Sequence, residues 1–86
     1  MNSKEFVQAC EDGKTLVWGH NGLRMLKRSI NEKKLYYLDV ETGFSIVFDR
    51  VEMCGNSSVF MILGENTVGI IPTKDWDVLP KKEVGE

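Results

Sequence analysis

The spacing of apolar and polar positions along the chain predicts one short helix followed by a series of strands. Phe6, Ala9 and Cys10 recur at the spacing of a single helix face. Asn2 or Ser3 can cap the first turn of this helix, because their side-chain oxygens accept hydrogen bonds from its free amide groups. The glycine at position 13 then offers the left-handed residue that commonly ends a helix. The pattern therefore predicts a helix close to the N-terminus.

After this helix, most apolar residues recur with a period of two, which is typical of strands. Breaks that contain Gly, Asn or Pro separate these runs, which cover residues 14–18, 35–40, 44–53, 59–63, 67–71 and 75–79. Residues 23–30 fit either a strand or a helix, and we favour a strand because hairpins surround them. The nearly continuous apolar run 59–63 should be central and covered on both faces. We expect an α+β fold, with the N-terminal helix packed on a strongly bent antiparallel sheet, or small barrel, of about six strands.

The composition fits a single small domain. Of the 86 residues, 42% are hydrophobic and 28% charged, so we expect one domain over residues 1–80 and a flexible tail over residues 81–86. A core of this size is thin, and self-association commonly adds stability, so we expect a homo-oligomer. The sequence has no C-x-x-C pair, no signal-peptide core and no membrane-spanning apolar run. These features predict a cytoplasmic protein with no membrane partner.

Charge is unevenly spread along the chain. Residues 23–34 carry five lysine or arginine residues against one glutamate, whereas residues 35–80 carry seven acidic residues against two basic ones. The formal net charge is −2, which is unlike the basic character of most nucleic-acid-binding domains, so a nucleic-acid partner is not expected. The basic stretch leaves room for one local site that attracts a small anion, although an exposed hairpin can carry the same residues for solvation alone.

The residue types that carry catalysis are scarce. His20 is the only histidine, so no histidine pair is available for a metal, and the two cysteines lack a common zinc-ligand spacing. No G-x-S-x-G motif surrounds a serine, and the sequence has no phosphate-binding glycine loop. The sequence therefore predicts a protein that is not an enzyme and has no catalytic residue, no metal site and no cofactor.

Residue types suited to ligand binding are more numerous than those suited to catalysis. Aromatic side chains with a polar end can stack on a base and donate a hydrogen bond, and polar donors follow the first tryptophan. The candidate ligand-binding residues are Trp18, His20, Asn21, Arg24, Tyr36 and Trp76. In a domain this small, a tryptophan more often fills the core. Tyr36 and Tyr37 point to opposite faces on a strand, so only one of them can face inward.

Two segments at the ends of the chain carry a family pattern. Residues 6–18 read Phe-Val-Gln-Ala-Cys-Glu-Asp-Gly-Lys-Thr-Leu-Val-Trp, and residues 73–79 read Thr-Lys-Asp-Trp-Asp-Val-Leu. They resemble the start and the end of the second Thoeris anti-defence family of phage proteins. That family begins with a helix, a Gly-Lys turn into a strand and soon a tryptophan, and ends with an acidic residue and Trp before a short strand. Residues 68–72 and Val17 depart from the family pattern.

The resemblance implies a homo-oligomeric sponge that acts in the host bacterial cytosol. Such proteins sequester cyclic ADP-ribose-type signals in pockets between subunits, without turning them over. By resemblance, Trp18 and Trp76 would lie near the pocket, and the charge of residues 24–34 suits the pyrophosphate of such a ligand. An alternative is a small protein-interaction module that inhibits a host protein through a sheet edge or through the acidic C-terminal half. A small enzyme is the third hypothesis.

Overall fold

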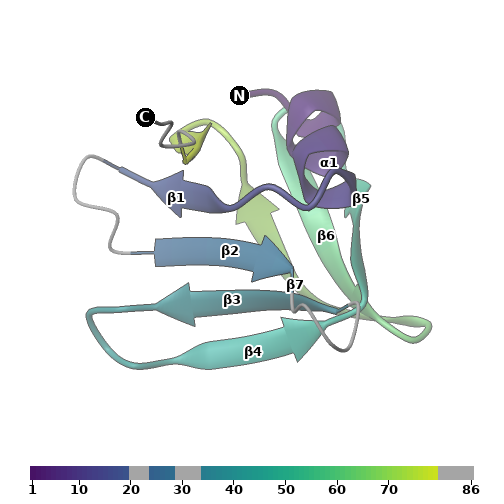
Figure 1. Ribbon diagram of the computed structural model, residues 1–86. Helices are drawn as coiled ribbons and strands as arrows, with labels where there is room; N and C mark the ends of the chain where they lie inside the picture. The colour runs from purple at the N-terminus through teal and green to yellow at the C-terminus, as the bar shows by residue number, and fades with distance from the viewer. Residues whose placement is uncertain (20–23, 29–33, 80–86) are drawn as a thin grey trace.

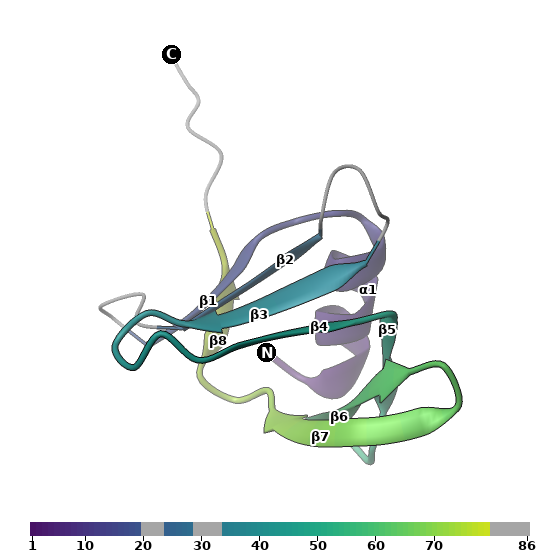
Figure 2. The same ribbon diagram turned by 90° about the horizontal axis from the view of Figure 1, so that it is seen from below.

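The computed structural model describes residues 1–19, 24–28 and 34–79, and within them it contains one helix and eight strands. In chain order these elements are α1 (Ser3–Glu11), β1 (Leu16–Trp18), β2 (Arg24–Arg28), β3 (Leu35–Asp39), β4 (Ser45–Phe48), β5 (Arg50–Met53), β6 (Ser58–Leu63), β7 (Asn66–Pro72) and β8 (Trp76–Val78). A large antiparallel sheet has the order β4-β3-β2-β1-β8, and a small one has the order β5-β6-β7. Figures 1 and 2 show the small sheet running across the large one, with α1 beside β5 and β6.

The predicted N-terminal helix is confirmed, and its ends follow from local chemistry. The Asn2 side chain accepts a hydrogen bond from the Glu5 backbone N–H (2.8 Å), and Glu5 Oε1 accepts one from the Asn2 N–H (3.0 Å). This reciprocal pair satisfies two amide groups that would otherwise lack partners, and such a cap stabilises a helix by about 1 kcal/mol. Gly13 follows the helix with a φ of +79°, a conformation that glycine adopts without strain. The helix buries Phe6 and Cys10 on the predicted face.

The predicted α+β class and the antiparallel pairing of the strands are confirmed, but the prediction of about six strands in one bent sheet or small barrel is wrong. Two antiparallel sheets of five and three strands are present, and they are not closed into a barrel. Residues 44–53, predicted as one strand, bend at Asp49 into β4 of the large sheet and β5 of the small one. Asp49 Oδ2 accepts a hydrogen bond from the Gly64 N–H (2.7 Å), and Asp49 Oδ1 lies 2.5 Å from Lys34 Nζ. We call this bend and its partners the Asp49 corner.

The core lies between the two sheets and α1. Its most completely buried apolar members come from the helix and from both sheets: Phe6, Cys10, Leu16, Leu26, Leu35, Phe48, Val59 and Trp76. β6 is the central strand of the small sheet, as predicted for residues 59–63, but it is not covered on both faces, because Phe60 is half-buried and Leu63 is exposed. No helix in the described part of the chain is long and apolar enough to cross a bilayer.

The ambiguous stretch 23–30 contains a strand. Arg24–Arg28 forms β2, which pairs with β1 on one side and with β3 on the other. The preference for a strand over a helix is therefore confirmed for these five residues. Residues 23, 29 and 30 lie outside the described part of the chain, as does the predicted tail over residues 81–86.

Candidate ligand-binding site

One row of side chains crosses the inner face of the large sheet. β1 pairs with both β8 and β2, so Trp18 lies directly opposite Trp76 on one side and Arg24 on the other. Arg24 in turn lies opposite Asp39 of β3. Residues that face each other across antiparallel strands point to the same side of a sheet, so strand register alone brings these side chains together. We call Trp76, Trp18, Arg24 and Asp39 the cross-strand row.

Arg24 is held in this row by two contacts. Its Cζ lies 4.7 Å from the centroid of the Trp18 ring, and its Nε lies 3.5 Å from Asp39 Oδ2. Asp39 is itself fixed, because its Oδ1 accepts hydrogen bonds from the N–H groups of Glu41 (3.0 Å) and Thr42 (3.3 Å). The Arg24 side chain stays 43% exposed, and within the described part of the chain its Nη groups have no hydrogen-bond partner. Arg24 therefore presents oriented donors that suit a phosphate or carboxylate group.

Trp76, Trp18 and Arg24 of the cross-strand row form part of one wall of a cleft between the two sheets. The cleft has a volume of about 420 Å³, within the range of small-molecule sites. Residues of the large sheet and of the turns beside it line one side: Trp18, Arg24, Tyr37, Phe44, Asp75 and Trp76. Residues of β6 and β7 line the other side: Met61, Ile70, Ile71 and Pro72. We call this hollow the aromatic cleft.

The aromatic rings in the cleft differ in exposure. Trp76 is only 2% exposed, and its ring meets Phe6 edge-to-face with centroids 5.7 Å apart. Tyr37 lies between Trp76 and Phe44, with its ring centroid 6.3 Å from each of theirs. Phe44 is 58% exposed, and Trp18 and Tyr37 are half-buried. Trp76 thus forms the floor of the cleft, whereas Trp18, Tyr37 and Phe44 offer surface on which a planar ligand can stack.

Three of the six predicted site residues meet in this cleft, namely Trp18, Arg24 and Trp76. Tyr36 lies on the opposite face of the sheet, where its cross-strand partners are the exposed Lys27 and Val47, and Tyr37 takes the inward position instead. Strand parity required that one of the two tyrosines face outward, but it could not say which. His20 and Asn21 lie outside the described residues.

Sequence reasoning missed Phe44 and Asp75 as members of the site. Phe44 is placed by the turn that Asp39 organises, where the Asp39 N–H donates to the Phe44 carbonyl (2.8 Å). Asp75 lies just before β8, and its carbonyl accepts a hydrogen bond from the Gly19 N–H (3.1 Å), which holds it beside the end of β1. Both placements depend on contacts between segments distant in sequence or on turn geometry, so strand periodicity carried no signal for them.

The predicted basic cluster is divided by the fold. Lys27 is exposed on the face of β2 away from the cleft, and Lys34 bonds to Asp49 at the corner between the sheets. Among the basic residues whose side chains are described, Arg24 alone lines the aromatic cleft, and Asp75 brings an opposite charge to the same lining. The described lining of the cleft is therefore aromatic, with one charged side chain of each sign.

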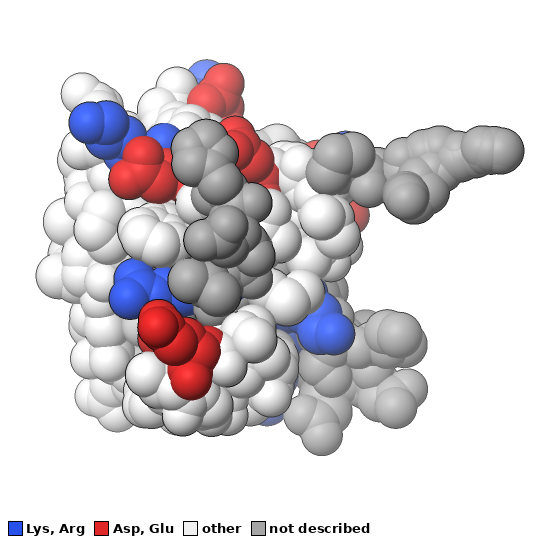
Figure 3. Space-filling view, turned by 90° about the vertical axis from the view of Figure 1, so that its left-hand side faces the viewer, with Lys and Arg blue, Asp and Glu red and all other residues white. Residues whose placement is uncertain are grey.

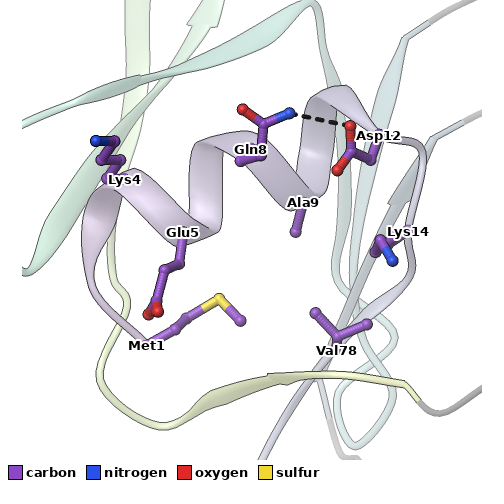
Figure 4. A pocket seen from close by; sticks show the side chains of 8 residues that line it. All are labelled: Met1, Lys4, Glu5, Gln8, Ala9, Asp12, Lys14 and Val78. Atoms are coloured by element: carbon purple, nitrogen blue, oxygen red, sulfur yellow. Dashed lines mark hydrogen bonds between the residues drawn. The ribbon is translucent and has the colours of Figure 1, made fainter.

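A second hollow lies between α1 and β8 and has a larger volume, about 580 Å³. Figure 4 shows it lined by Met1, Lys4, Glu5, Gln8, Ala9, Asp12, Lys14 and Val78. Two lysines and two carboxylates are among the residues that line this α1–β8 groove, and Gln8 Nε2 already donates to Asp12 Oδ1 (3.0 Å). No aromatic ring is found among its described lining residues. The aromatic cleft is the better candidate despite its smaller volume, because it combines stacking surfaces with an oriented guanidinium.

Comparison of the chain with known protein families, curated proteins and solved structures gave no match. Within residues 1–19, 24–28 and 34–79, no group of three or more His, Cys, Asp and Glu side chains is arranged to hold a metal ion. The resemblance of the chain ends to an anti-defence family therefore stays a prediction.

Proposed function

We propose that this protein captures a small nucleotide-like ligand in the aromatic cleft and holds it without chemical turnover. The observation that carries the proposal is the cross-strand row, in which the Trp18 ring lies between Trp76 and an Arg24 guanidinium that is already oriented. Together with the resemblance of the chain ends, this geometry favours a cyclic ADP-ribose-like signal. The biological role would then be that of a phage anti-defence sponge in the host cytosol.

Different lining residues would bind the base and the phosphate of the ligand. A base that stacks on Trp18, Tyr37 or Phe44 gains about 1–3 kcal/mol, and it does so whichever base it is. The Nη groups of Arg24 can take one phosphate through charge-assisted hydrogen bonds. With one described cation in the cleft, stacking supplies the larger share of the affinity, and the affinity should fall only modestly as salt increases.

The absence of turnover is proposed from the chemistry of the lining. Its described members are aromatic and aliphatic side chains with one arginine and one aspartate, and no Ser, Cys, Lys or His stands among them. No described lining residue pairs a nucleophile with a base, as covalent catalysis requires. Recovery of the intact ligand after heat release from the protein supports capture, whereas recovery of a cleaved product identifies an enzyme.

A thermal-shift panel of adenine nucleotides, cyclic dinucleotides and cyclic ADP-ribose isomers tests the proposal. A ligand present at about 100 times its dissociation constant stabilises the folded state by about 2.7 kcal/mol, which raises the midpoint of a domain this small by several degrees. We expect a shift with at least one nucleotide and a larger one with the physiological signal. A flat panel at millimolar ligand contradicts the proposal.

One observation favours protein interaction as a second candidate function. β7 pairs only with β6 among the described strands, so one edge of the seven-residue strand is open. The strand carries no charged residue, and its Ile70 side chain is 57% exposed. Open, uncharged edges can accept an added strand from another chain, either a host protein or a second copy. Co-purification of one stoichiometric host protein would support this candidate, and sedimentation of the purified protein would detect a homo-oligomer.

The acidic surface is a weaker basis for such an interaction. Figure 3 shows Lys and Arg side chains interspersed with Asp and Glu on one face of the molecule, with a wide uncharged area beside them. A protein that imitates a polyanion needs a concentrated field of one sign. On the face in view the charges of opposite sign lie side by side, so the open edge of β7 is the more specific feature.

A further inference from the structure

Among the described residues that line the aromatic cleft, Asp75 is the one carboxylate. The Gly19–Asp75 backbone hydrogen bond places it next to the paired residues Trp18 and Trp76. Its side chain is exposed and, within the described part of the chain, makes no hydrogen bond or ion pair. Asp39, by contrast, is occupied by Arg24 and by its own turn. Asp75 is therefore available to a ligand that enters the cleft.

The opposite charges of Asp75 and Arg24 favour one orientation of a nucleotide bound in the cleft. Arg24 lies on one side of Trp18 in the cross-strand row, and Asp75 precedes Trp76, which lies on the other side. A phosphate is attracted to the guanidinium and repelled by the carboxylate, so it should lie at the Arg24 end. A base stacked on the aromatic rings then turns its polar edge toward the Asp75 end.

The Asp75 carboxylate determines which hydrogen-bonding group the nearby edge of the base must carry. An ionised aspartate only accepts hydrogen bonds, so it favours a donor and disfavours another acceptor. The exocyclic amino groups of adenine, guanine and cytosine are donors, whereas an exocyclic oxygen in the same place is an acceptor. We propose, on the basis of the proposed nucleotide-binding function, that Asp75 accepts a hydrogen bond from the exocyclic amino group of the base and makes the cleft selective for amino-bearing bases.

The expected selectivity is moderate because Asp75 is exposed to water. A hydrogen bond to a charged group at such a site corresponds to about a 10-fold difference in affinity, at the lower end for charged partners. AMP and IMP are suitable probes, because the base of IMP carries an exocyclic oxygen at the position where the base of AMP carries its exocyclic amino group. Titration followed by tryptophan fluorescence measures both dissociation constants in the same low-salt buffer, since Trp18 and Trp76 line the cleft.

Asp75→Asn is the decisive variant and Asp77→Asn is its matched control. Asp77 is also exposed, but it lies one residue beyond Trp76 on the opposite face of β8, across from Val17. In the wild-type protein we expect AMP to bind about 10-fold more tightly than IMP. Asp75→Asn should bring this ratio close to one, because an amide both donates and accepts, and Asp77→Asn should leave it unchanged. Thermal unfolding of each variant without ligand verifies that it folds.

The possible outcomes separate the two proposals. Equal affinities for AMP and IMP in the wild-type protein, or an unchanged ratio in Asp75→Asn, overturn the role of Asp75 while nucleotide binding stands. Failure of AMP and IMP to bind the wild-type protein, when another nucleotide of the thermal-shift panel does bind, overturns the role of Asp75 alone. Failure of every nucleotide in the panel contradicts nucleotide capture itself and the role of Asp75 with it. Loss of the ratio in Asp77→Asn as well as in Asp75→Asn would show a general effect of charge and would also overturn the assignment.

Discussion

Two regions of this protein pair an aspartate with a cation, and they use the pair differently. At the Asp49 corner, the carboxylate accepts from Lys34 and from the Gly64 backbone, so it joins the bend of the chain to the turn between β6 and β7. In the cross-strand row, Asp39 orients Arg24, whose guanidinium covers the Trp18 ring and still faces the cleft. The first pair fixes the position of backbone segments, whereas the second positions a donor for something outside the chain.

The difference lies in the cation and its neighbours more than in the carboxylate. In each aspartate, one carboxylate oxygen accepts from backbone N–H and the other oxygen contacts a basic side chain. The planar guanidinium of Arg24 can stack on a ring, bond to a carboxylate and still present further N–H groups. We therefore expect changes at the corner to act on stability, and changes at the exposed part of the row to act on ligand binding.

Trp76→Ala should have the largest effect, because Trp76 belongs to the row but also fills the core. Its ring is buried against Phe6 and Tyr37, and removal of a buried tryptophan typically costs about 3–5 kcal/mol of folding free energy. In a domain this small, such a loss approaches the total stability. Urea unfolding followed by circular dichroism measures it. A loss below about 1 kcal/mol would show that the ring is not part of the core.

Arg24→Ala should separate binding from folding. The lost cation–π contact and exposed ion pair together contribute about 1 kcal/mol or less to stability. The lost charge-assisted bonds to a phosphate should weaken nucleotide binding about 10-fold or more. Lys27→Ala is the control, because Lys27 lies on the same strand but faces away from the cleft. If Arg24→Ala and Lys27→Ala weaken binding equally, the assignment of Arg24 to the site is wrong.

Asp49→Asn should have a smaller effect, confined to stability and its dependence on pH. The hydrogen bond from Lys34 and that from the Gly64 N–H lower the pKa of Asp49 below its ordinary value. A lowered pKa in the folded state means that the carboxylate adds stability above its unfolded pKa, near 4, and that this contribution is lost as the pH falls through the folded value. The variant should therefore be less stable than the wild type at pH 7, and the difference between their free energies of unfolding should shrink in acid.

Chemical denaturation at pH 7 and at pH 3 tests this behaviour. Nucleotide affinity at pH 7 should be unchanged, because Asp49 does not line the cleft. A variant with the stability of the wild type at both pH values would contradict the structural role of the corner. A specific loss of nucleotide affinity would contradict the division between the two aspartate pairs.

Local sequence signals predicted the elements better than their assembly. The helix was predictable because the capping residues at positions 2 and 3, the glycine at position 13 and the 3.6-residue period agree. The division of residues 44–53 into two strands was not, because Phe44, Ile46 and Phe48 continue the same alternation up to the bend. Hydrogen bonds of Asp49 to segments distant in sequence fix that bend. Periodicity carries no information about such contacts.

The same limit applies to the candidate site. Trp18, Arg24 and Trp76 were predictable as residue types suited to stacking and to anions, and the antiparallel register of β1 then brought them together. Tyr37 was chosen over Tyr36 by the register of β3, which a slip of one residue would reverse. The dispersal of Lys27 and Lys34 away from Arg24 likewise follows from strand parity and from the Asp49 corner.

Chemical-shift mapping by NMR during titration with AMP and with cyclic ADP-ribose tests the central claim most directly. We predict that the shifts concentrate on the aromatic cleft: the two indole N–H groups, the Arg24 side chain, and the amides around Tyr37 and Asp75. Shifts that concentrate instead on Lys4, Gln8 and Lys14 would place the ligand in the α1–β8 groove. That result, or a spectrum that neither nucleotide changes, would contradict the assignment of the aromatic cleft as the binding site.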